Sequence, residues 1–351
     1  MNQEQLIPYK NINTTWNEET SLLQLSLPWI SLKIKLDSTY KTPFNENGTL
    51  SHQILNGLAK FPLTRVAPRN NFSIENKLYV EKTSLNNLAP NEIFKKLDIN
   101  YQLQNNTWIW DHISILESIK INEDSYDPLS LYGLLTEMRL FEEHEANLSL
   151  NFFKKLNELL EINDETFIKA ISFILEQTYY ITNHCIESLM PAISSYLPAS
   201  NLVSDFIKEE MNHDRLVLKS LKVLSPSSPR IEKVTVETKT LMSLLKKSAE
   251  SYFLGFSCII GSFEGIGYSA EDPLAVLLKK SSKPEAAIGI QQHYMINKNG
   301  NHSAVGEGFI RTLPAIDKNT ALNAIYLTEL ITRVRISFSK KIYEAVQNEL
   351  N

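Results

Sequence analysis

The chain has 351 residues, which is enough for two domains of ordinary size. Its 35 basic and 40 acidic side chains give a net charge of −5, and this mild acidity argues against a nucleic acid or an anionic membrane surface as partner, since either would require a dense basic patch. Apolar residues make up 43% of the chain and charged residues 21%, a composition typical of a packed globular protein and not of a disordered one.

The cysteine content and the N-terminal residues exclude further classes. Cys185 and Cys258 are too few for a disulfide framework, and neither belongs to a CxxC zinc motif. The initial sequence MNQEQLIPYK lacks the basic and apolar regions of a signal peptide. Because no apolar run approaches the ~20 residues that span a bilayer, we expect a cytoplasmic protein with no membrane segment.

The first 125 residues predict a mixed α/β domain of unknown role. Apolar side chains alternate over Trp29–Leu36, which is the period of a half-buried strand. Further strands are predicted over Leu78–Val80 and Trp108–Ile115, and short helices over Ser51–Leu58 and Asn91–Leu97. All four tryptophans of the chain lie in this half.

From residue 126 onward the sequence predicts a helical domain that extends to residue 351, so the whole protein is expected to be mainly α. Its last helix carries a long apolar stripe at helical spacing. Proline-, serine- and glycine-rich segments separate the helices, which we expect at about 128–146, 150–161, 165–190, 200–223, 238–266, 271–280, 284–297 and 318–349.

The segment EEMNHD at 209–214 carries the sharpest chemical pattern. Glu210 and His213 are three residues apart, so on one helix they share a face, where a carboxylate and an imidazole can bind a transition metal together. Glu209, four residues before His213, offers an alternative carboxylate. Such a pair is common on helix surfaces, so the prediction of a metal site depends on further candidate ligands elsewhere in the chain.

Two carboxylates lie within strongly apolar helical segments. Glu176 is surrounded by AISFILEQTYYI, and Glu264 follows FLGFSCIIGSF. A buried carboxylate needs a partner, which is either a cation in a structural ion pair or a metal ion. Together with Glu210 and His213, these residues predict a metal site to which successive helices contribute inward-facing ligands.

A later segment, 291–308, supplies two more histidines. His293 and His302 are nine residues apart, so they cannot face one site from a continuous helix. The sequence NKNGN between them favours a break in the helix, which would allow both to bind. Glu137 and His144 form another possible pair, but the many charges around them are typical of a solvated face.

At these residues the chain resembles the haem-oxygenase-like di-iron oxidases, also called iron-containing redox enzymes. The matching elements are Glu176-Gln177 with Tyr179-Tyr180, then Glu210 and His213, then Glu264-Gly265, and finally the helix that begins near His293. The resemblance covers about residues 150–345 and implies a haem-oxygenase-like helical bundle. The last motif departs from the pattern, because Asn297 stands at the aspartate position and His302 comes two residues late. Glu307 is a candidate for the missing carboxylate if the backbone bulges.

The resemblance implies a non-haem di-iron oxidase or oxygenase that uses O2 on a small molecule, such as an amino acid, an amine or a fatty acid. It implies one or two iron ions, with manganese as the alternative metal, bound by Glu176, Glu210, His213, Glu264, His293 and His302. A homodimer is also expected. Three alternatives remain: a metal-free thiaminase-like hydrolase with Cys185 or Cys258 as nucleophile, a ferritin-like bundle, and a non-catalytic binding or dimerisation protein.

Overall fold

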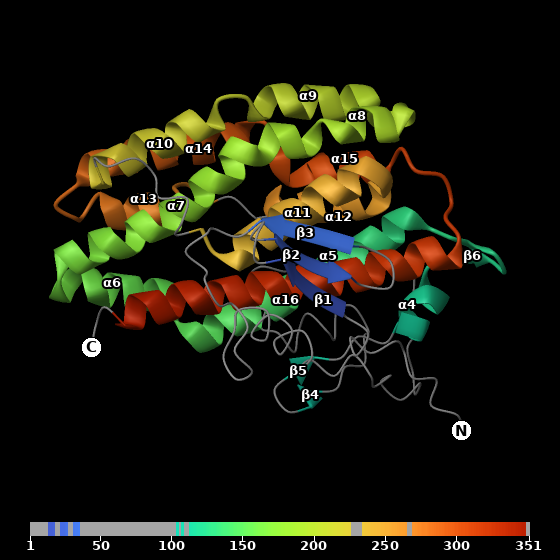
Figure 1. Ribbon diagram of the computed structural model, residues 1–351, viewed down its shortest axis with the longest axis horizontal. Coiled ribbons are helices and arrows are strands. Elements are labelled where there is room, and N and C mark those ends of the chain that lie inside the picture. The colour runs from blue at the N-terminus through green and yellow to red at the C-terminus, as the bar shows by residue number, and fades with distance from the viewer. Residues whose placement is uncertain are drawn as a thin grey trace.

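The computed structural model describes residues 13–17, 22–26, 31–35, 103–104, 107–108, 112–225, 234–264 and 269–348. Helices account for most of these residues, so the predicted mainly α fold is confirmed (Figure 1). None of the described helices is both long enough and apolar enough to cross a membrane. The helices are α4 (His112–Ser118), α5 (Pro128–Leu150), α6 (Phe152–Ile162), α7 (Asp164–Leu189), α8 (Pro191–Ser195), α9 (Ser200–Glu210), α10 (His213–Leu224), α11 (Val236–Ser251), α12 (Phe253–Glu264), α13 (Pro273–Leu278), α14 (Ala287–Asn299), α15 (Val305–Ile310) and α16 (Lys318–Asn348), with 3₁₀ turns η2 (Leu197–Ala199), η4 (Pro284–Ala286) and η5 (His302–Ala304).

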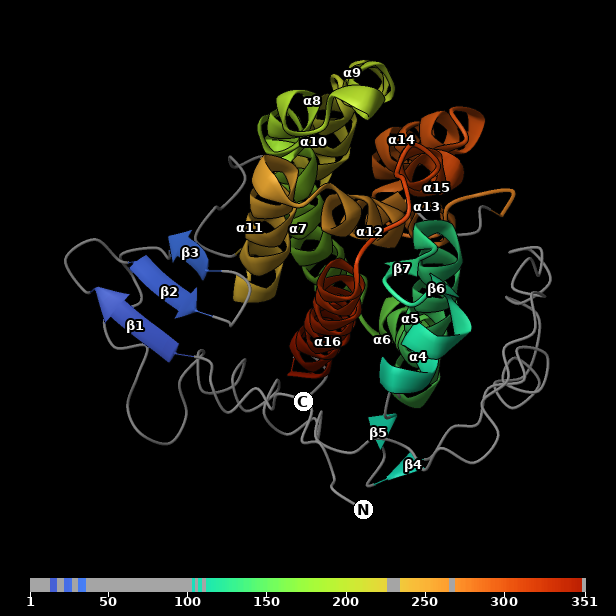
Figure 2. The same cartoon turned by 90° about the vertical axis from the view of Figure 1, so that its right-hand side faces the viewer.

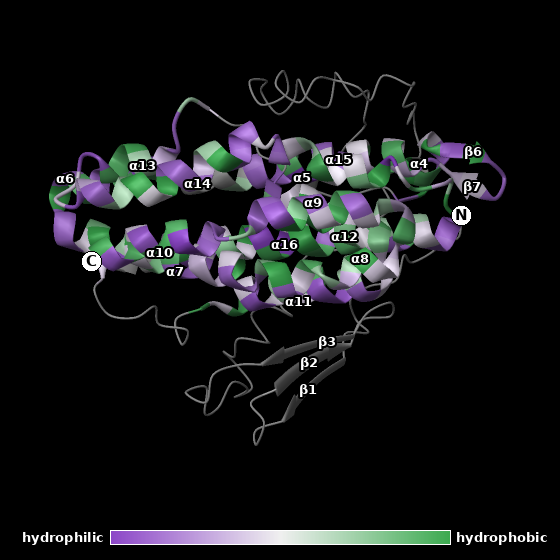
Figure 3. Cartoon of the chain, turned by 90° about the horizontal axis from the view of Figure 1, so that it is seen from above, coloured by the Kyte–Doolittle hydropathy of each residue, from purple (hydrophilic) through white to green (hydrophobic). Residues whose placement is uncertain are grey.

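The long helix α16 is the common element of the core. The view turned by 90° shows α5 on one side of α16 and α7 and α11 on the other (Figure 2). The apolar stripe predicted for this helix is buried, and Ile325, Leu330 and Val334 are each at most 3% exposed. Green and purple residues alternate along the helices in Figure 3, as expected for segments that bury one face and expose the other.

Three apolar clusters fill the helical body. The first lies between α8, α9, α11, α12 and α16, and the second between α4, α5, α12 and α16. The third joins α6, α7, α10, α13 and α14, with Ile342 of α16. Side-chain caps begin several of these helices: the Asn163 side chain accepts from the Thr166 amide at α7, and Asp272 accepts from two amides at α13.

The described strands of the N-terminal region form small antiparallel sheets. Strands β1 (Asn13–Asn17), β2 (Leu22–Ser26) and β3 (Ser31–Lys35) pair in that order, and β3 contacts α11. The strand predicted over Trp29–Leu36 is therefore confirmed. A second pair consists of β4 (Leu103–Gln104) and β5 (Thr107–Trp108). The elements predicted over Leu78–Val80, Ser51–Leu58 and Asn91–Leu97 lie outside the described residues.

The strand predicted over Trp108–Ile115 is wrong from His112 onward, because α4 begins there. Leu116 and Ile119 follow Ile115 by one and four residues, a spacing typical of one face of a helix. All three side chains lie in the core beside α5 and α16. The hairpin of β6 (Lys120–Asn122) and β7 (Ser125–Tyr126) follows, and Tyr126 exchanges two backbone hydrogen bonds with Ile316. Helix α4 thus packs against the helical body although it precedes residue 126.

Two long predicted helices are each divided in two. The helix predicted over 200–223 breaks at Asn212, whose left-handed backbone with φ of 72° ends α9 at Glu210 and starts α10 at His213. The helix predicted over 238–266 breaks at Tyr252, which has an extended φ of −145° between α11 and α12. The short helices α8 and α15 were not predicted.

Most of the charged segment of α5 that was predicted to be solvated is buried, although His144 is exposed. Arg139 and Glu142 are 2% and 3% exposed, because α16 places Arg333 and Arg335 opposite them. Arg333 donates to both carboxylate oxygens of Glu142, with 3.3 Å between Nη2 and Oε1. The sequence pattern was misleading here because the compensating charges lie about 190 residues away in the chain.

Replacing Arg333 with methionine is expected to destabilise the protein by about 3–5 kcal/mol, because it leaves the Glu142 carboxylate buried without its cation. The free energy of unfolding in urea measures the loss. The control is Arg311→Met, which breaks the exposed pair with Glu307 and should cost less than about 1 kcal/mol. Equal losses in the two variants would show that burial of the Arg333–Glu142 pair does not matter.

Candidate metal centre

Side chains from two helices and one 3₁₀ turn converge on one point. Glu210 is the last residue of α9, Glu264 is the last of α12, and His302 is the first of η5. The Nδ1 atom of His302 lies 3.1 Å from Glu210 Oε1 and 3.2 Å from Glu264 Oε2. One ligand atom from each of the three lies within 4.8 Å of the others, so these residues can hold a single ion.

His213, the first residue of α10, extends this cluster. Its Nδ1 lies 3.1 Å from Glu210 Oε2, and its ring packs against the His293 ring at a centroid distance of 5.0 Å. Its Nε2 is buried and has no hydrogen-bond partner among the described residues. Asn297 is also buried, and its Nδ2 lies 3.5 Å from Glu264 Oε2.

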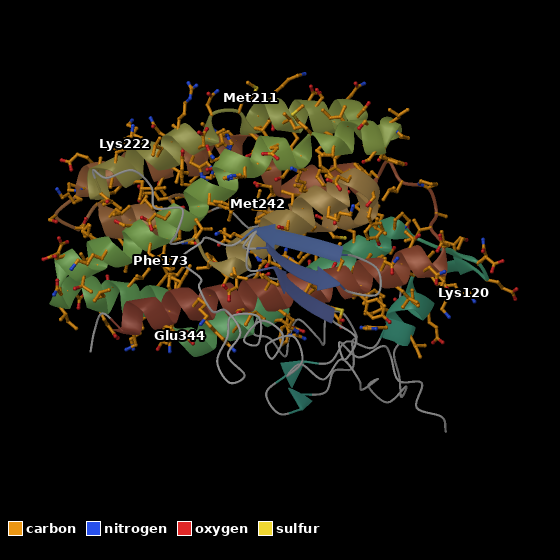
Figure 4. All side chains as sticks on the ribbon, in the orientation of Figure 1. Lys120, Phe173, Met211, Lys222, Met242 and Glu344 are labelled. Carbon is orange, nitrogen blue, oxygen red and sulfur yellow. The ribbon has the colours of Figure 1, made fainter. Side chains whose placement is uncertain are left out.

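Two asparagines in the left-handed region create the turns that aim these ligands inward. Asn212 has φ of 72° and directly precedes His213, and Asn301 has φ of 54° and directly precedes His302. Asparagine tolerates this conformation better than most residues do. Glu210 and His213 therefore meet across a break between two helices, and the prediction that they lie on one continuous helix is wrong. Figure 4 labels Met211 within that break, where its side chain is exposed.

The break predicted between His293 and His302 is observed. Helix α14 ends at Asn299, Gly300 follows, and the turn at Asn301 reverses the chain into η5. Both histidines consequently reach the same cluster, His293 through His213 and His302 directly, with the His213 and His302 rings 5.9 Å apart.

The protonation equilibria of the cluster follow from burial and close contacts. Burial would raise the pKa of Glu210, but hydrogen bonds from His213 and His302 lower it to about 2. Burial and the nearby Glu210 raise the pKa of Glu264, although His302 opposes this. Burial would lower the pKa of His302, but its two carboxylate partners raise it to about 10. Burial and the neighbouring His213 lower the pKa of His293 to about 4.

The other predicted ligands lie outside this cluster or at its edge. Glu209 is half exposed, with Oε2 3.3 Å from His302 Nε2. Glu307 pairs with Arg311 on its own helix. Glu176 is buried on α7, but it lies about 100–180° around that helix from the α7 residues that line the cavity beside the cluster. The structure thus does not place Glu176 or Glu307 with the other ligands.

A cavity of about 720 Å³ adjoins the cluster, and its lining is mainly apolar. Glu210, Glu264, His293 and Asn297 form part of its wall. Glu137 and His144, expected on a solvated face, also line it, as do Glu143 and Arg335. Sequence reasoning missed the last two because only the pairing of α5 with α16 brings them together. Such a volume is typical of a small-molecule site.

The residues present fit a metal ion. Carboxylates and imidazoles suit Fe(II), Mn(II) or Zn(II), and the buried Nε2 of His213 is an imidazole nitrogen of the kind such ions bind. In the absence of a metal, a protonated His302 between Glu210 and Glu264 satisfies the same groups as an ion-pair network. Comparison of the chain with protein-family models, curated proteins and solved structures found no match.

Proposed function

We propose that this protein is an O2-dependent non-haem iron oxidase or oxygenase of the haem-oxygenase-like type, acting on a small molecule. The observation that carries the proposal is the convergence of Glu210, Glu264 and His302 on one point in the wall of an apolar cavity. A metal site in the wall of a mainly apolar cavity of this size is an arrangement suited to oxidation chemistry, because the cavity can hold substrate and O2 beside the metal.

Glu210, Glu264 and His302 would hold the first ion. A second ion would be held by His213 and His293, which lie beside Glu210. Bound iron supplies the electrons that activate O2, and Mn(II) is the alternative metal. Phe206 packs edge-on against the His302 ring at 5.4 Å and lines the cavity, so it orients this ligand and keeps the site apolar.

A thiaminase-like hydrolase is the competing enzyme, since Cys185 Sγ lies 3.9 Å from Glu210 Oε2 in the cavity wall. The nucleophilic thiolate that such a hydrolase requires is unfavourable at this position. Burial, together with Glu210 and Glu264, raises the pKa of the Cys185 thiol well above its ordinary value. Glu210, with a pKa of about 2, is too weak a base to take a proton from that thiol. The other thiol, Cys258, is buried with a pKa raised to about 12.

The test is anaerobic loading of the purified protein with Fe(II), followed by desalting, measurement of bound iron and exposure to O2. We expect one or two iron ions per chain and an absorbance change when O2 is added. Zn(II) is the matched control, since it fits the same ligands but is not redox-active and should give no O2-dependent change. Iron at background level would overturn the proposal in favour of a structural ion-pair network in a non-catalytic binding protein.

A further inference from the structure

The His302 ring has a second nitrogen that takes no part in the cluster. Its Nδ1 lies 3.1 Å from Glu210 Oε1 and 3.2 Å from Glu264 Oε2, whereas its Nε2 points away from these carboxylates. Nε2 is buried and completes no hydrogen bond among the described residues, but Glu209 Oε2 lies 3.3 Å from it. A buried ring nitrogen is costly unless it has a partner, so the nearby carboxylate calls for an explanation.

The surroundings of the His302 ring hold it in this orientation. The Phe206 ring packs against it at a centroid distance of 5.4 Å, with 72° between the two planes. At the other contact, a Cβ atom added at Gly300 would lie 2.8 Å from His302 Cδ2 and 3.0 Å from Nε2, so the ring fits because residue 300 has no side chain. These contacts keep Nδ1 toward the cluster and Nε2 toward Glu209.

Glu209 is available as a hydrogen-bond acceptor for this nitrogen. It is the penultimate residue of α9, its side chain is 47% exposed, and no lysine or arginine pairs with it among the described residues. A half-exposed glutamate side chain can rotate, and a small rotation brings an oxygen into line with the Nε2 proton. Glu210 cannot take this place, because its two oxygens contact His213 and the Nδ1 of His302.

Glu209 does not fit the role of a direct ligand, which was the alternative that its place in the sequence offered. An ion bound by Nδ1 together with Glu210 and Glu264 lies on the inner side of the His302 ring, and Glu209 lies on the outer side. Accordingly, the Glu209 carboxylate is not among the ligand atoms that lie within 4.8 Å of one another. It contacts a ligand of the proposed ion and not the ion itself.

We infer that Glu209 is a positioning residue of the metal centre, which accepts the Nε2 proton of His302 and so leaves the Nδ1 lone pair facing the ion. Metal-bound histidines commonly donate their second ring N–H to a carboxylate, which fixes the tautomer and makes the imidazole a stronger ligand. The inference rests on the proposed function only in that it requires a metal at Glu210, Glu264 and His302, and it needs neither O2 nor redox chemistry.

Equilibrium titration of the full chain with Zn(II), which fits the same ligands, separates the hydrogen bond of Glu209 from its charge. Glu209→Ala removes both and should lower the zinc affinity about 10–100-fold. Glu209→Gln removes the charge but keeps an acceptor oxygen, so it should recover a large part of that loss. The control is Asp205→Asn, which removes an exposed carboxylate one turn earlier on α9 that pairs with Lys208, and it should bind zinc as the parent does.

The tautomer of His302 is a readout that a merely structural role of Glu209 would not move. In zinc-loaded protein with ¹⁵N-labelled histidine, long-range ¹H–¹⁵N correlations distinguish the protonated ring nitrogen from the metal-bound one, and His302 is identified by the loss of its signals in His302→Ala. We expect zinc at Nδ1 and the proton at Nε2 in the parent. That proton should exchange with solvent faster in Glu209→Ala than in Glu209→Gln, which keeps an acceptor.

The possible failures of this inference and of the proposed function differ in outcome. Zinc bound through Nε2, equal zinc affinity in the parent and Glu209→Ala, or equal losses in Glu209→Ala and Glu209→Gln would each overturn the role of Glu209 and leave the metal proposal standing. A folded parent that binds neither zinc nor iron would overturn both. Iron that binds without reacting with O2 would overturn the oxidase alone, and the role of Glu209 would stand on the zinc results.

Discussion

Replacing His302 with alanine is expected to abolish iron binding at the position that it shares with Glu210 and Glu264. The side chain is fully buried and contacts Glu209, Glu210 and Glu264. Its removal takes an imidazole ligand from the site and leaves Glu210 and Glu264 facing each other without a cation between them. The two carboxylates that remain at this position favour hard ions such as Mg²⁺ and Ca²⁺, so affinity for Fe(II) there should fall below the range in which iron survives desalting.

The measurement is bound iron per chain after anaerobic loading, with thermal unfolding of the variant as a check that it is folded. His144→Ala is the matched control, since His144 lines the same cavity but is an exposed residue that belongs to no ligand cluster among the described residues. Free imidazole, which fits the space left by the deleted ring, should restore part of the iron binding to His302→Ala. Undiminished iron in His302→Ala would place the metal elsewhere.

The site could be predicted from the sequence to a large extent, but for reasons that were partly incorrect. Residue type and apolar surroundings identified Glu210, His213, Glu264, His293 and His302, which the structure brings together. The expected geometry of a single ExxH helix was wrong, because Asn212 breaks it. Glu176 was predicted as a ligand for the same reason, namely its apolar surroundings. However, it directly follows Leu175, which lines the cavity, and successive residues of a helix point about 100° apart.

In the fold, likewise, features that depend on neighbouring residues in the sequence could be predicted, and features that depend on distant residues could not. Helical periodicity located most helices because each buries one face, and the stripe on α16 is the clearest case. Breaks without proline or glycine, such as those at Asn212 and Tyr252, leave no strong local pattern. The burial of Arg139 and Glu142 depends on partners from α16, and a charge pattern on one segment carries no information about such partners.

The close crossing of α12 and α15 positions two of the proposed ligands. Gly261 precedes Glu264 by three residues, and Gly306 follows His302 by four. A Cβ atom added at Gly306 would lie 3.0 Å from both the Cα and the N of Gly261 and 2.5 Å from the Tyr132 hydroxyl. Because two of these atoms belong to a helix backbone and the third to a buried aromatic ring, no flexible side chain can relieve the clash.

Gly306→Ala should therefore push α15 away from α12 and separate His302 from Glu264 without changing either ligand. We expect a loss of about 1–3 kcal/mol in the free energy of unfolding, the usual cost of overpacking. We also expect iron affinity to fall roughly 10–100-fold, as it does when a group that orients a ligand is altered. Urea unfolding and equilibrium titration with Fe(II) under anaerobic conditions measure the two effects.

Gly308→Ala is the matched control, because it lies on the same helix and a Cβ there meets no atom within 4 Å. It should raise stability by up to about 1 kcal/mol through helix propensity and leave iron affinity unchanged. If Gly306→Ala lost stability but bound iron as the parent does, the crossing would serve packing alone. If both variants lost iron affinity equally, the loss would stem from α15 in general and not from its contact with α12.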